Sequence, residues 1–508
     1  MKNHRFIYRN ISAVLLAGMS LIAVSCDDKN LEDVKNTGTF DANNYFKNEE
    51  QAFTGLVATY DMLHKYSSGF ENTVTFFNGA SDDFYSGGGN SSDGAGIQGF
   101  SNYTINPVIM PLSYWKDYYK GIASANLLLD RIPNASMNDQ TRNRYIAEAK
   151  VLRSLYYFEL VRMFKNVPLI LKPILVSDDF YNVPQAKPED VYALIEGDIL
   201  AAMPDLMMTG SGANEKGRIT QGTARAILGK IYLYDKKNTE AAAQFQMVNG
   251  TPGETSQYGY KLVSNFSDLW KVDNKYTSES ILEVMHTNGS RADWGFWGTG
   301  QDEGNSINVM LGIISYKKIS TDAPDIYASW GFNPITDDLF NFMQGDPRLD
   351  ATILNGKKLK QEGKIDYSPG FKDTGYFLNK FAPRNADKSP LTGPTELNFR
   401  QNYIAIRLAD TYLMEAEALG ASGARAQALL DAVRARVGLA SVPVSLQAIK
   451  DERRRELAGE GHRWFDLVRW GDAPAKLGAR GFVAGKNEIL PIPFNELVGT
   501  ALKQNPQY

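Results

Sequence analysis

The stretch that decides the fold of this chain lies near its C-terminus and reads Glu452-Arg453-Arg454-Arg455-Glu456-Leu457-Ala458-Gly459-Glu460-Gly461-His462-Arg463-Trp464-Phe465-Asp466-Leu467-Val468-Arg469-Trp470-Gly471. Side chains four positions apart share one face of a helix, so Arg453 stacks with Leu457 and Trp464 with Val468. Burying two tryptophans and a phenylalanine this close together contributes several kcal/mol, because apolar area contributes about 25 cal/mol per Å². We therefore predict a helix over residues 446–470 whose motif residues pack a core and take no part in chemistry.

Helical periodicity continues upstream of this stretch. Apolar side chains at spacings of three and four predict a helix from Tyr114 to Ile132, which Pro133 ends, and another over residues 139–164. Further helices are predicted over residues 188–203, 220–234 (with Thr220 as N-cap), 403–419 and 424–437. We expect neighbouring helices to pair as αα-hairpins, the helix over 188–203 with that over 220–234. The sequence thus predicts a mostly α fold, a tetratricopeptide-like helical-repeat scaffold with long irregular loops and short strands, without a strict period of about 34 residues.

Two long inserts interrupt the helical pattern, at about residues 73–111 and 249–394. Both are rich in glycine, serine, asparagine, aspartate and aromatic residues. Loops of this length on a rigid scaffold are where binding residues concentrate. We expect residues 41–508 to form a single domain that carries its ligand-binding loops in these two inserts.

The composition excludes several classes of function. The 508 residues carry 54 basic and 58 acidic side chains, a net charge of −4, with no basic block long enough to follow a phosphate backbone, so no nucleic acid partner is predicted. There are only one cysteine and four histidines, which excludes disulfide frameworks, thiolate zinc sites and Cys/His catalysis. We predict no cofactor, no metal site and no catalytic residue.

The N-terminus has the pattern of a lipoprotein signal. A basic start is followed by an uncharged run from Ile11 to Val24, too short to span a bilayer, and then by Cys26. This arrangement resembles a bacterial lipobox, although a cleaved signal with an incidental cysteine is the alternative. We expect residues 1–25 to be removed, Cys26 to be acylated, and residues 26–40 to form an acidic tether that anchors the protein to membrane lipid through the acylated Cys26.

Several motifs, most of them near the C-terminus and two further upstream, resemble those of one family. Besides the opening stretch, they are Arg407-Leu408-Ala409-Asp410-Thr411-Tyr412-Leu413-Met414-Glu415-Ala416-Glu417-Ala418, Leu490-Pro491-Ile492-Pro493-Phe494-Asn495-Glu496-Leu497, Lys216-Gly217-Arg218-Ile219-Thr220 and Asp346-Pro347-Arg348-Leu349. Together with the lipoprotein start, they resemble the SusD/RagB family of Bacteroidetes outer-membrane nutrient-binding lipoproteins. The sequence departs from the family pattern at Ala458-Gly459-Glu460, because members of the family more often have an aromatic residue before Glu-Gly at this place.

This resemblance implies a function. It implies a SusD-like fold and a lipoprotein that faces the cell exterior, binds an oligosaccharide or polysaccharide, and delivers it to a SusC-like TonB-dependent outer-membrane barrel. It implies no enzyme activity. A peptide-binding, RagB-like uptake lipoprotein is one alternative.

Candidate ligand contacts follow from the chemistry of sugars. The apolar face of a sugar ring stacks on aromatic side chains, and its hydroxyls require amide, carboxylate or guanidinium partners. Exposed aromatics beside such groups occur in three segments, whose candidates are Trp294, Phe296 and Trp297, then Asp83 and Tyr85, and then Tyr327 and Trp330. The opposing interpretation for each is that the side chain packs a loop onto the scaffold.

A surface glycoside hydrolase is the alternative from another class. Such an enzyme uses two carboxyl groups roughly 5–10 Å apart across a sugar. The adjacent acids Asp82 and Asp83, with Asp302 and Glu303, are the available pairs. Paired acids in polar loops are more often solvated turns, so we favour binding over catalysis.

Overall fold

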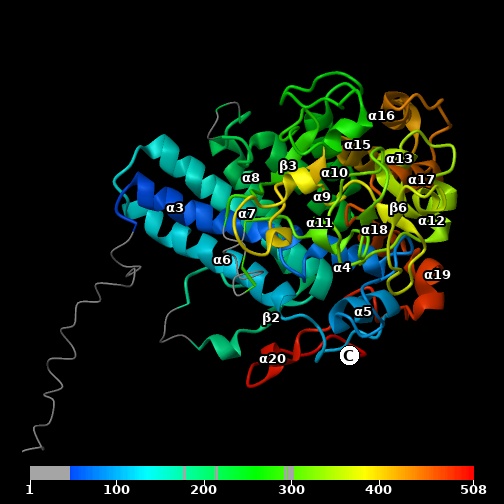
Figure 1. The fold of residues 1–508 in the computed structure, drawn as a ribbon. Coiled ribbons are helices and arrows are strands. Elements are labelled where there is room, and N and C mark those ends of the chain that lie inside the picture. The colour runs from blue at the N-terminus through cyan, green and yellow to red at the C-terminus, as the bar shows by residue number, and fades with distance from the viewer. Residues whose placement is uncertain (1–45, 175–178, 211, 213–214, 291–292, 295–302) are drawn as a thin grey trace, which may run out of the picture. The chain divides into compact units, whose positions relative to one another are not determined.

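The computed structural model describes residues 46–508 except for residues 175–178, 211, 213–214, 291–292 and 295–302. The predicted signal peptide, the tether over 26–40 and Cys26 therefore lie outside the described residues. Residues 47–508 form one compact unit (Figure 1).

Helices account for most of the regular structure. The N-terminal part contains α3 (Glu49–Tyr60), α4 (Thr73–Ala80), α5 (Ala95–Asn102), α6 (Ser113–Arg131), α7 (Asp139–Phe164), α8 (Pro188–Ala202), α9 (Gln221–Tyr234) and α10 (Asn238–Asn249). The C-terminal part contains α11 (Ile307–Met310), α12 (Asp337–Phe342), α13 (Leu349–Thr352), α14 (Gly356–Gln361), α15 (Leu408–Ala418), α16 (Gly423–Arg436), α17 (Leu446–Glu456), α18 (Arg463–Trp470), α19 (Ala473–Leu477) and α20 (Phe494–Leu497).

The strands are short and form antiparallel pairs. The pairs are β1 (Val167–Pro168) with β2 (Gln185–Ala186), β3 (Ser280–Val284) with β8 (Tyr403–Arg407), β4 (Lys317–Lys318) with β6 (Ile365–Asp366), and β5 (Ile353–Asn355) with β7 (Tyr376–Leu378). The predicted mostly α class with long loops and short strands is confirmed.

The scaffold is built from helices that lie side by side. Helices α3, α6 and α7 pack on one another, and α7 also packs on α8 (Figure 1). At the crossing of α6 and α7 the backbones approach so closely that a Cβ on Gly121 would lie 2.6 Å from the Tyr156 ring. The Tyr156 hydroxyl donates to the Thr59 carbonyl of α3, 2.5 Å away, and so joins the three helices.

The pairing of the middle helices differs from the prediction. Thr220 caps α9 as predicted, because its hydroxyl accepts the backbone N–H of Thr223. However, α8 packs mainly on α7, and α9 packs mainly on α10. The prediction missed α10, which begins only four residues after α9 ends. That turn is Asp235-Lys236-Lys237 with Lys236 in the left-handed region, a short connection that brings the two helices together.

The structure also differs from the predicted elements at three places. Residues 403–407 form strand β8 before α15 begins, because their side chains are all buried between β3 and the core. The insert over 73–111 contains α4 and α5. The helix predicted over 446–470 is two helices, since Gly459 and Gly461 adopt φ of 80° and 81°, values that break a right-handed helix.

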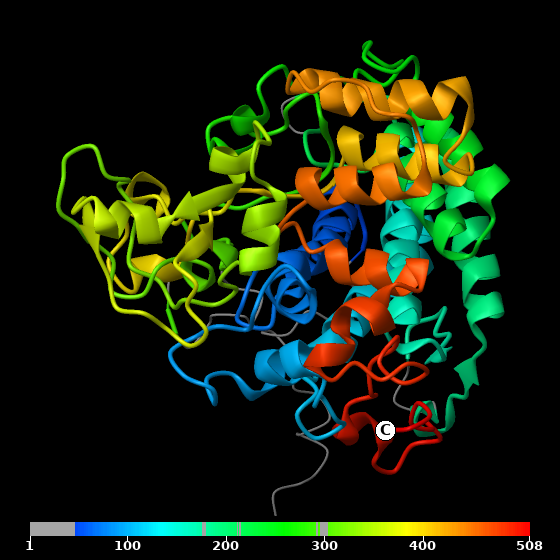
Figure 2. The same ribbon diagram turned by 90° about the vertical axis from the view of Figure 1, so that its right-hand side faces the viewer.

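The motif helices close the core against the N-terminal part. The Phe77 ring of α4 lies 4.3 Å from the Phe465 ring and 5.0 Å from the Trp464 ring, centroid to centroid. Asn78 donates to the Gly459 carbonyl at 2.9 Å. Figures 1 and 2 show these late helices, in orange and red, alongside the blue segment that contains α4. The prediction that the motif aromatics pack a core is confirmed for Trp464 and Phe465, whereas Trp470 is half-buried.

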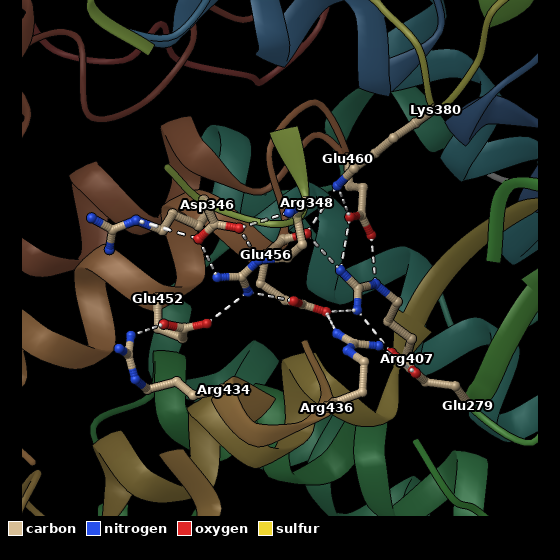
Figure 3. Close-up of polar contacts among 11 residues, drawn as sticks. Glu279, Asp346, Arg348, Lys380, Arg407, Arg434, Arg436, Glu452, Glu456 and Glu460 are labelled. Atoms are coloured by element: carbon tan, nitrogen blue, oxygen red, sulfur yellow. Dashed lines mark hydrogen bonds and ion pairs between the residues drawn. The ribbon is translucent and has the colours of Figure 1, made fainter. Parts of the chain in front are cut away.

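A buried network of charges lies beside the motif (Figure 3). The Arg407 guanidinium contacts the carboxylates of Glu279, Glu456 and Glu460 at 2.5 to 2.8 Å. The same network includes Asp346, Arg348, Lys380, Arg434, Arg436 and Glu452. Burial alone would raise the pKa of Glu460, but the charges of Arg407 and Lys380 outweigh it and hold that pKa below its ordinary value. The network therefore consists of ionised groups that compensate one another.

Candidate functional site

The segment that contains Tyr85 lies beside the segment that contains Tyr327 and Trp330, although the two are about 250 positions apart in the chain. The Tyr85 N–H donates to the Pro334 carbonyl at 3.1 Å, and the Gly88 N–H donates to the Gly331 carbonyl at 2.9 Å. The same pairing forms antiparallel bridges at Phe84 and at Gly87. The segment that carries Tyr85 therefore runs along the continuation of the segment that carries Tyr327 and Trp330.

Backbone hydrogen bonds hold the segment over residues 327–330 in place. Its N–H groups donate to the Pro383 carbonyl from Tyr327 at 2.7 Å, to the Ile313 carbonyl from Ser329 at 2.9 Å and to the Val309 carbonyl of α11 from Trp330 at 2.9 Å. The fit is close, because a Cβ on Gly312 would lie 2.2 Å from the Ser329 hydroxyl. The Tyr327 and Trp330 side chains thus extend from a rigid backbone.

Trp294 and Trp330 form an aromatic pair at the surface. Their ring centroids are 5.9 Å apart and the ring planes differ by 19°, so the rings are nearly parallel. Trp294 keeps 57% of its surface exposed, and Trp330 is half-buried. The predicted candidates Phe296 and Trp297 lie outside the described residues. The described part of this site is an indole stack open to solvent, which we call the tryptophan platform.

The base of the loop that carries Trp294 is attached to residues 388–398. The Glu303 N–H donates to the Ser290 hydroxyl at 3.0 Å, and the Asn398 amide donates to the Ser290 carbonyl at 2.9 Å. Asn288 donates from its amide to the Lys388 carbonyl at 3.0 Å. These contacts fix where the loop leaves the scaffold and place polar side chains near it.

Lys388 also faces Tyr327. Its ammonium lies 4.8 Å from the centroid of the Tyr327 ring, within range of a cation–π contact. Burial, and then the nearby carboxylate of Glu396, raise the pKa of the Tyr327 hydroxyl. The hydroxyl therefore stays neutral at physiological pH and can both donate and accept a hydrogen bond. Sequence reasoning missed Lys388 and Asn288, because they stand in loops with no periodic pattern.

Tyr85 is half-buried between two cations. The Lys372 ammonium lies 5.1 Å from its ring centroid, and the Arg480 guanidinium lies 4.9 Å from it. Burial, and then the charge of Arg480, lower the pKa of Lys372. Two cations thus lie over the Tyr85 ring.

The adjacent acids Asp82 and Asp83 are held by arginines of the motif region. Arg463 donates to both oxygens of Asp82 at 2.8 Å, and Arg454 donates from Nε to the fully buried Asp83 at 2.7 Å. Burial would raise the pKa of Asp82, but Arg463 outweighs it and lowers that pKa, whereas burial keeps the pKa of Asp83 raised. Both carboxylates tie the loop to the scaffold, so we leave Asp83 out of the proposed ligand surface.

One group of possible metal ligands occurs among the described residues, formed by Asp61, His64 and Glu303. The His64 Nδ1 faces Asp61 at 3.7 Å, and its Nε2 faces Glu303 at 3.6 Å and the Met285 carbonyl at 3.0 Å. One ligand atom from each residue lies within 4.8 Å of the others, and the contact of His64 Nε2 with the Met285 carbonyl is the one hydrogen bond among those just given. Among the described residues, no helix is long and apolar enough to cross a bilayer.

The fold and the platform define a helical-repeat protein that presents an aromatic surface on its loops. Residues 229–488 match the family model described as "SusD family", and residues 32–233 match one described as "Starch-binding associating with outer membrane". The chain belongs to the SusD family. The resemblance drawn from its C-terminal motifs is confirmed.

Relatives with known descriptions agree with this assignment. "SusD-like protein P25" of Formosa agariphila is 25% identical over 79% of this chain and 81% of its own length. A solved "Laminarin binding SusD-like protein" is 60% identical and covers 91% of this chain and 100% of its own, with a TM-score of 0.90. "Surface glycan-binding protein A from Bacteroides fluxus" is 26% identical with the same coverage and a TM-score of 0.79.

Proposed function

We propose that the protein binds an oligosaccharide at the cell surface and delivers it to a TonB-dependent outer-membrane transporter. The sugar rings stack their apolar faces on the tryptophan platform, and their hydroxyls bond to the polar groups around it, among them the hydroxyl of Tyr327. Tyr85, whose segment pairs with the continuation of the Trp330 segment, remains a proposed contact. Phe296 and Trp297, in the loop of Trp294, remain proposed contacts.

The observation that carries this proposal is the solvent-open stack of Trp294 on Trp330. A core pair of indoles is closed to water, whereas more than half of Trp294 is exposed in a loop whose base is fixed. The similarity to a laminarin-binding protein, at 60% identity, supports a glycan as the ligand. Laminarin and laminarihexaose are therefore the first probes.

Calorimetry on the purified mature chain tests the platform. We expect Trp294→Ala/Trp330→Ala to weaken laminarihexaose binding at least tenfold, which is about 1.4 kcal/mol, because the stacking surface is removed. Phe494→Ala is the matched control, since Phe494 is similarly exposed, at 53%, but lies on α20. Full affinity in a folded double variant would contradict the platform, and binding of peptides without glycans would favour the RagB-like alternative.

We propose that the protein binds its ligand without cleaving it. The alternative hydrolase needs two available carboxyl groups, but Asp82 and Asp83 are occupied by Arg463 and Arg454. Asp302 lies outside the described residues, and Glu303 lies beside His64. Incubation of the protein with laminarin is expected to release no reducing sugar. Release that Glu303→Gln abolishes would instead support the hydrolase.

The anchor and the transporter partner complete the proposal. We expect Cys26→Ala to move the protein from the outer-membrane fraction to the soluble fraction, because the acyl chains supply the stable attachment. The wild type is expected to be cleaved by protease added to intact cells and to copurify with a SusC-like barrel. A membrane-bound Cys26→Ala protein would contradict the lipid anchor.

A further inference from the structure

A second pocket lies on the helical scaffold and shares no lining residue with the tryptophan platform. Its volume is about 420 Å³, within the range of small-ligand sites. It is formed where the start of α9 meets the loop before β3, and its wall includes Tyr258, Tyr260 and Tyr276. Lys216 and Ser278, on its rim, are exposed, so the pocket is open to solvent.

Tyr276 is held in this wall by a buried carboxylate. Its φ of 54° is in the left-handed region, which a bulky residue rarely adopts. The Tyr276 N–H donates to both oxygens of Glu283, at 3.1 and 3.0 Å, and Asn402 donates to Glu283 at 2.7 Å. Glu283 is 5% exposed. A strained backbone conformation and a buried carboxyl group thus both fix the position of this ring.

The opposite wall approaches the ring closely. Gly217 has a φ of 80°, and a Cβ there would lie 3.4 Å from the Tyr276 ring. The Lys216 ammonium lies 5.9 Å from the ring centroid. Glycine at position 217 lets this wall come close to one edge of the ring without a side chain between them.

Hydroxyl groups lie at the start of α9. Thr220 Oγ1 is 3.0 Å from Thr223 Oγ1 and 3.5 Å from the Tyr260 hydroxyl. The Thr223 hydroxyl donates to the Ile281 carbonyl at 2.9 Å and is therefore engaged, whereas the Tyr260 hydroxyl can accept a hydrogen bond from a ligand that carries hydroxyls of its own. The pocket thus combines aromatic rings with polar groups on its wall and rim.

The charges of the pocket favour a neutral ligand. Its lining holds two basic residues, Lys216 and Arg218, and two acidic ones, Glu215 and Glu283. Arg218 is already engaged, because it donates two hydrogen bonds to Glu148 at 3.0 and 2.5 Å. A phosphate or sulfate would therefore meet one available cation beside two carboxylates, a poor anion site.

We propose that this pocket is a second carbohydrate subsite, which binds a short neutral stretch of the glycan with a sugar ring against Tyr276. The inference rests on the proposed glycan-binding function. Two sites on one molecule bind a long polymer more tightly than either site alone, because the second contact forms at high effective concentration.

Hydrogen–deuterium exchange with laminarihexaose tests the subsite. In the wild type, the sugar is expected to slow exchange both in residues 258–260 and 276–283 and at the platform, residues 326–330. Tyr276→Gly removes the ring but suits the left-handed backbone, so it is expected to fold. It should abolish the protection in the pocket, leave that of the platform, and weaken binding of polymeric laminarin at least fivefold.

A matched variant controls for the backbone. Lys236→Gly is the same kind of change at an exposed left-handed position, with φ of 61°, outside both sites, and should alter nothing. Protection at the platform alone would overturn the subsite and leave the proposed function standing. Protection in the pocket alone would support the subsite and overturn the platform. Protection at neither site would overturn both, and pocket protection that survives Tyr276→Gly would overturn the role of the ring.

Discussion

Arg407 is the residue on which the buried charges converge, and its loss should be costly. Arg407→Leu leaves Glu279, Glu456 and Glu460 with fewer counter-charges in an interior that water does not reach. Removing one partner of a buried ion pair costs about 3–5 kcal/mol. We expect urea unfolding, followed by circular dichroism, to show a loss of that size. Arg400→Leu is the control, since Arg400 is 32% exposed and its loss should cost about 1 kcal/mol or less. Equal effects would contradict this role for burial.

Single residues also show where sequence reasoning ends. Trp294 and Trp330 were proposed as ligand contacts from their chemistry, because aromatics among glycines and polar residues are unusual, and their contact with a ligand stays a prediction. The same reasoning selected Asp83, whose partner Arg454 lies 371 positions away. Nothing local distinguishes an acid that is exposed in a loop from one paired with a distant arginine, so composition could not exclude it.

At the scale of elements, the break between α17 and α18 depends on two glycines. A Cβ on Gly459 would lie 2.5 Å from the Leu378 side chain. Gly471 also has a left-handed backbone conformation, but a Cβ there would meet no atom within 4 Å. Gly459→Ala therefore adds a steric clash to the backbone strain that both variants share. We expect thermal or urea unfolding to show that it costs about 1–3 kcal/mol more than Gly471→Ala. Equal costs would show that the clash relaxes.

The elements explain which parts of the fold the sequence could predict. Long amphipathic helices such as α6 and α7 follow from local periodicity, and their boundaries agree closely with the prediction. Hydrophobic periodicity does not reveal a turn inside a continuous apolar pattern, which is why the prediction gave α17 and α18 as one helix. Strand β8 is stabilised by pairing with β3, more than 100 positions away, and no local signal carries that information.

At the scale of the whole molecule, stability should fall in acid. Arg407 and Lys380 hold the pKa of Glu460 below 4.5, and arginines hold that of Glu456 well below the same value, although burial opposes them in both. A depressed folded pKa contributes stability above the unfolded value, which is lost as the pH falls through the folded value. The contribution of these two carboxylates to the free energy of unfolding is therefore expected to be level near pH 7 and to decline from about pH 4.5 downward. The depressed pKa values of the buried His286 and His462 add a decline that begins near pH 6.5, the ordinary histidine pKa. Glu460→Gln should be less stable at pH 7 and show a shallower decline, and parallel curves would contradict this assignment.

The buried network also determines when, during synthesis of the chain, the core can be completed. Its members come from positions 279, 346 to 348, 380, 407, 434 to 436 and 452 to 460, so the last counter-charges are synthesised when more than four fifths of the chain already exists. Until Glu456 and Glu460 are in place, Arg348 and Arg407 have too few anions to enter a dry interior. The chain cannot complete its core early, and it remains open to proteases until nearly its full length is available.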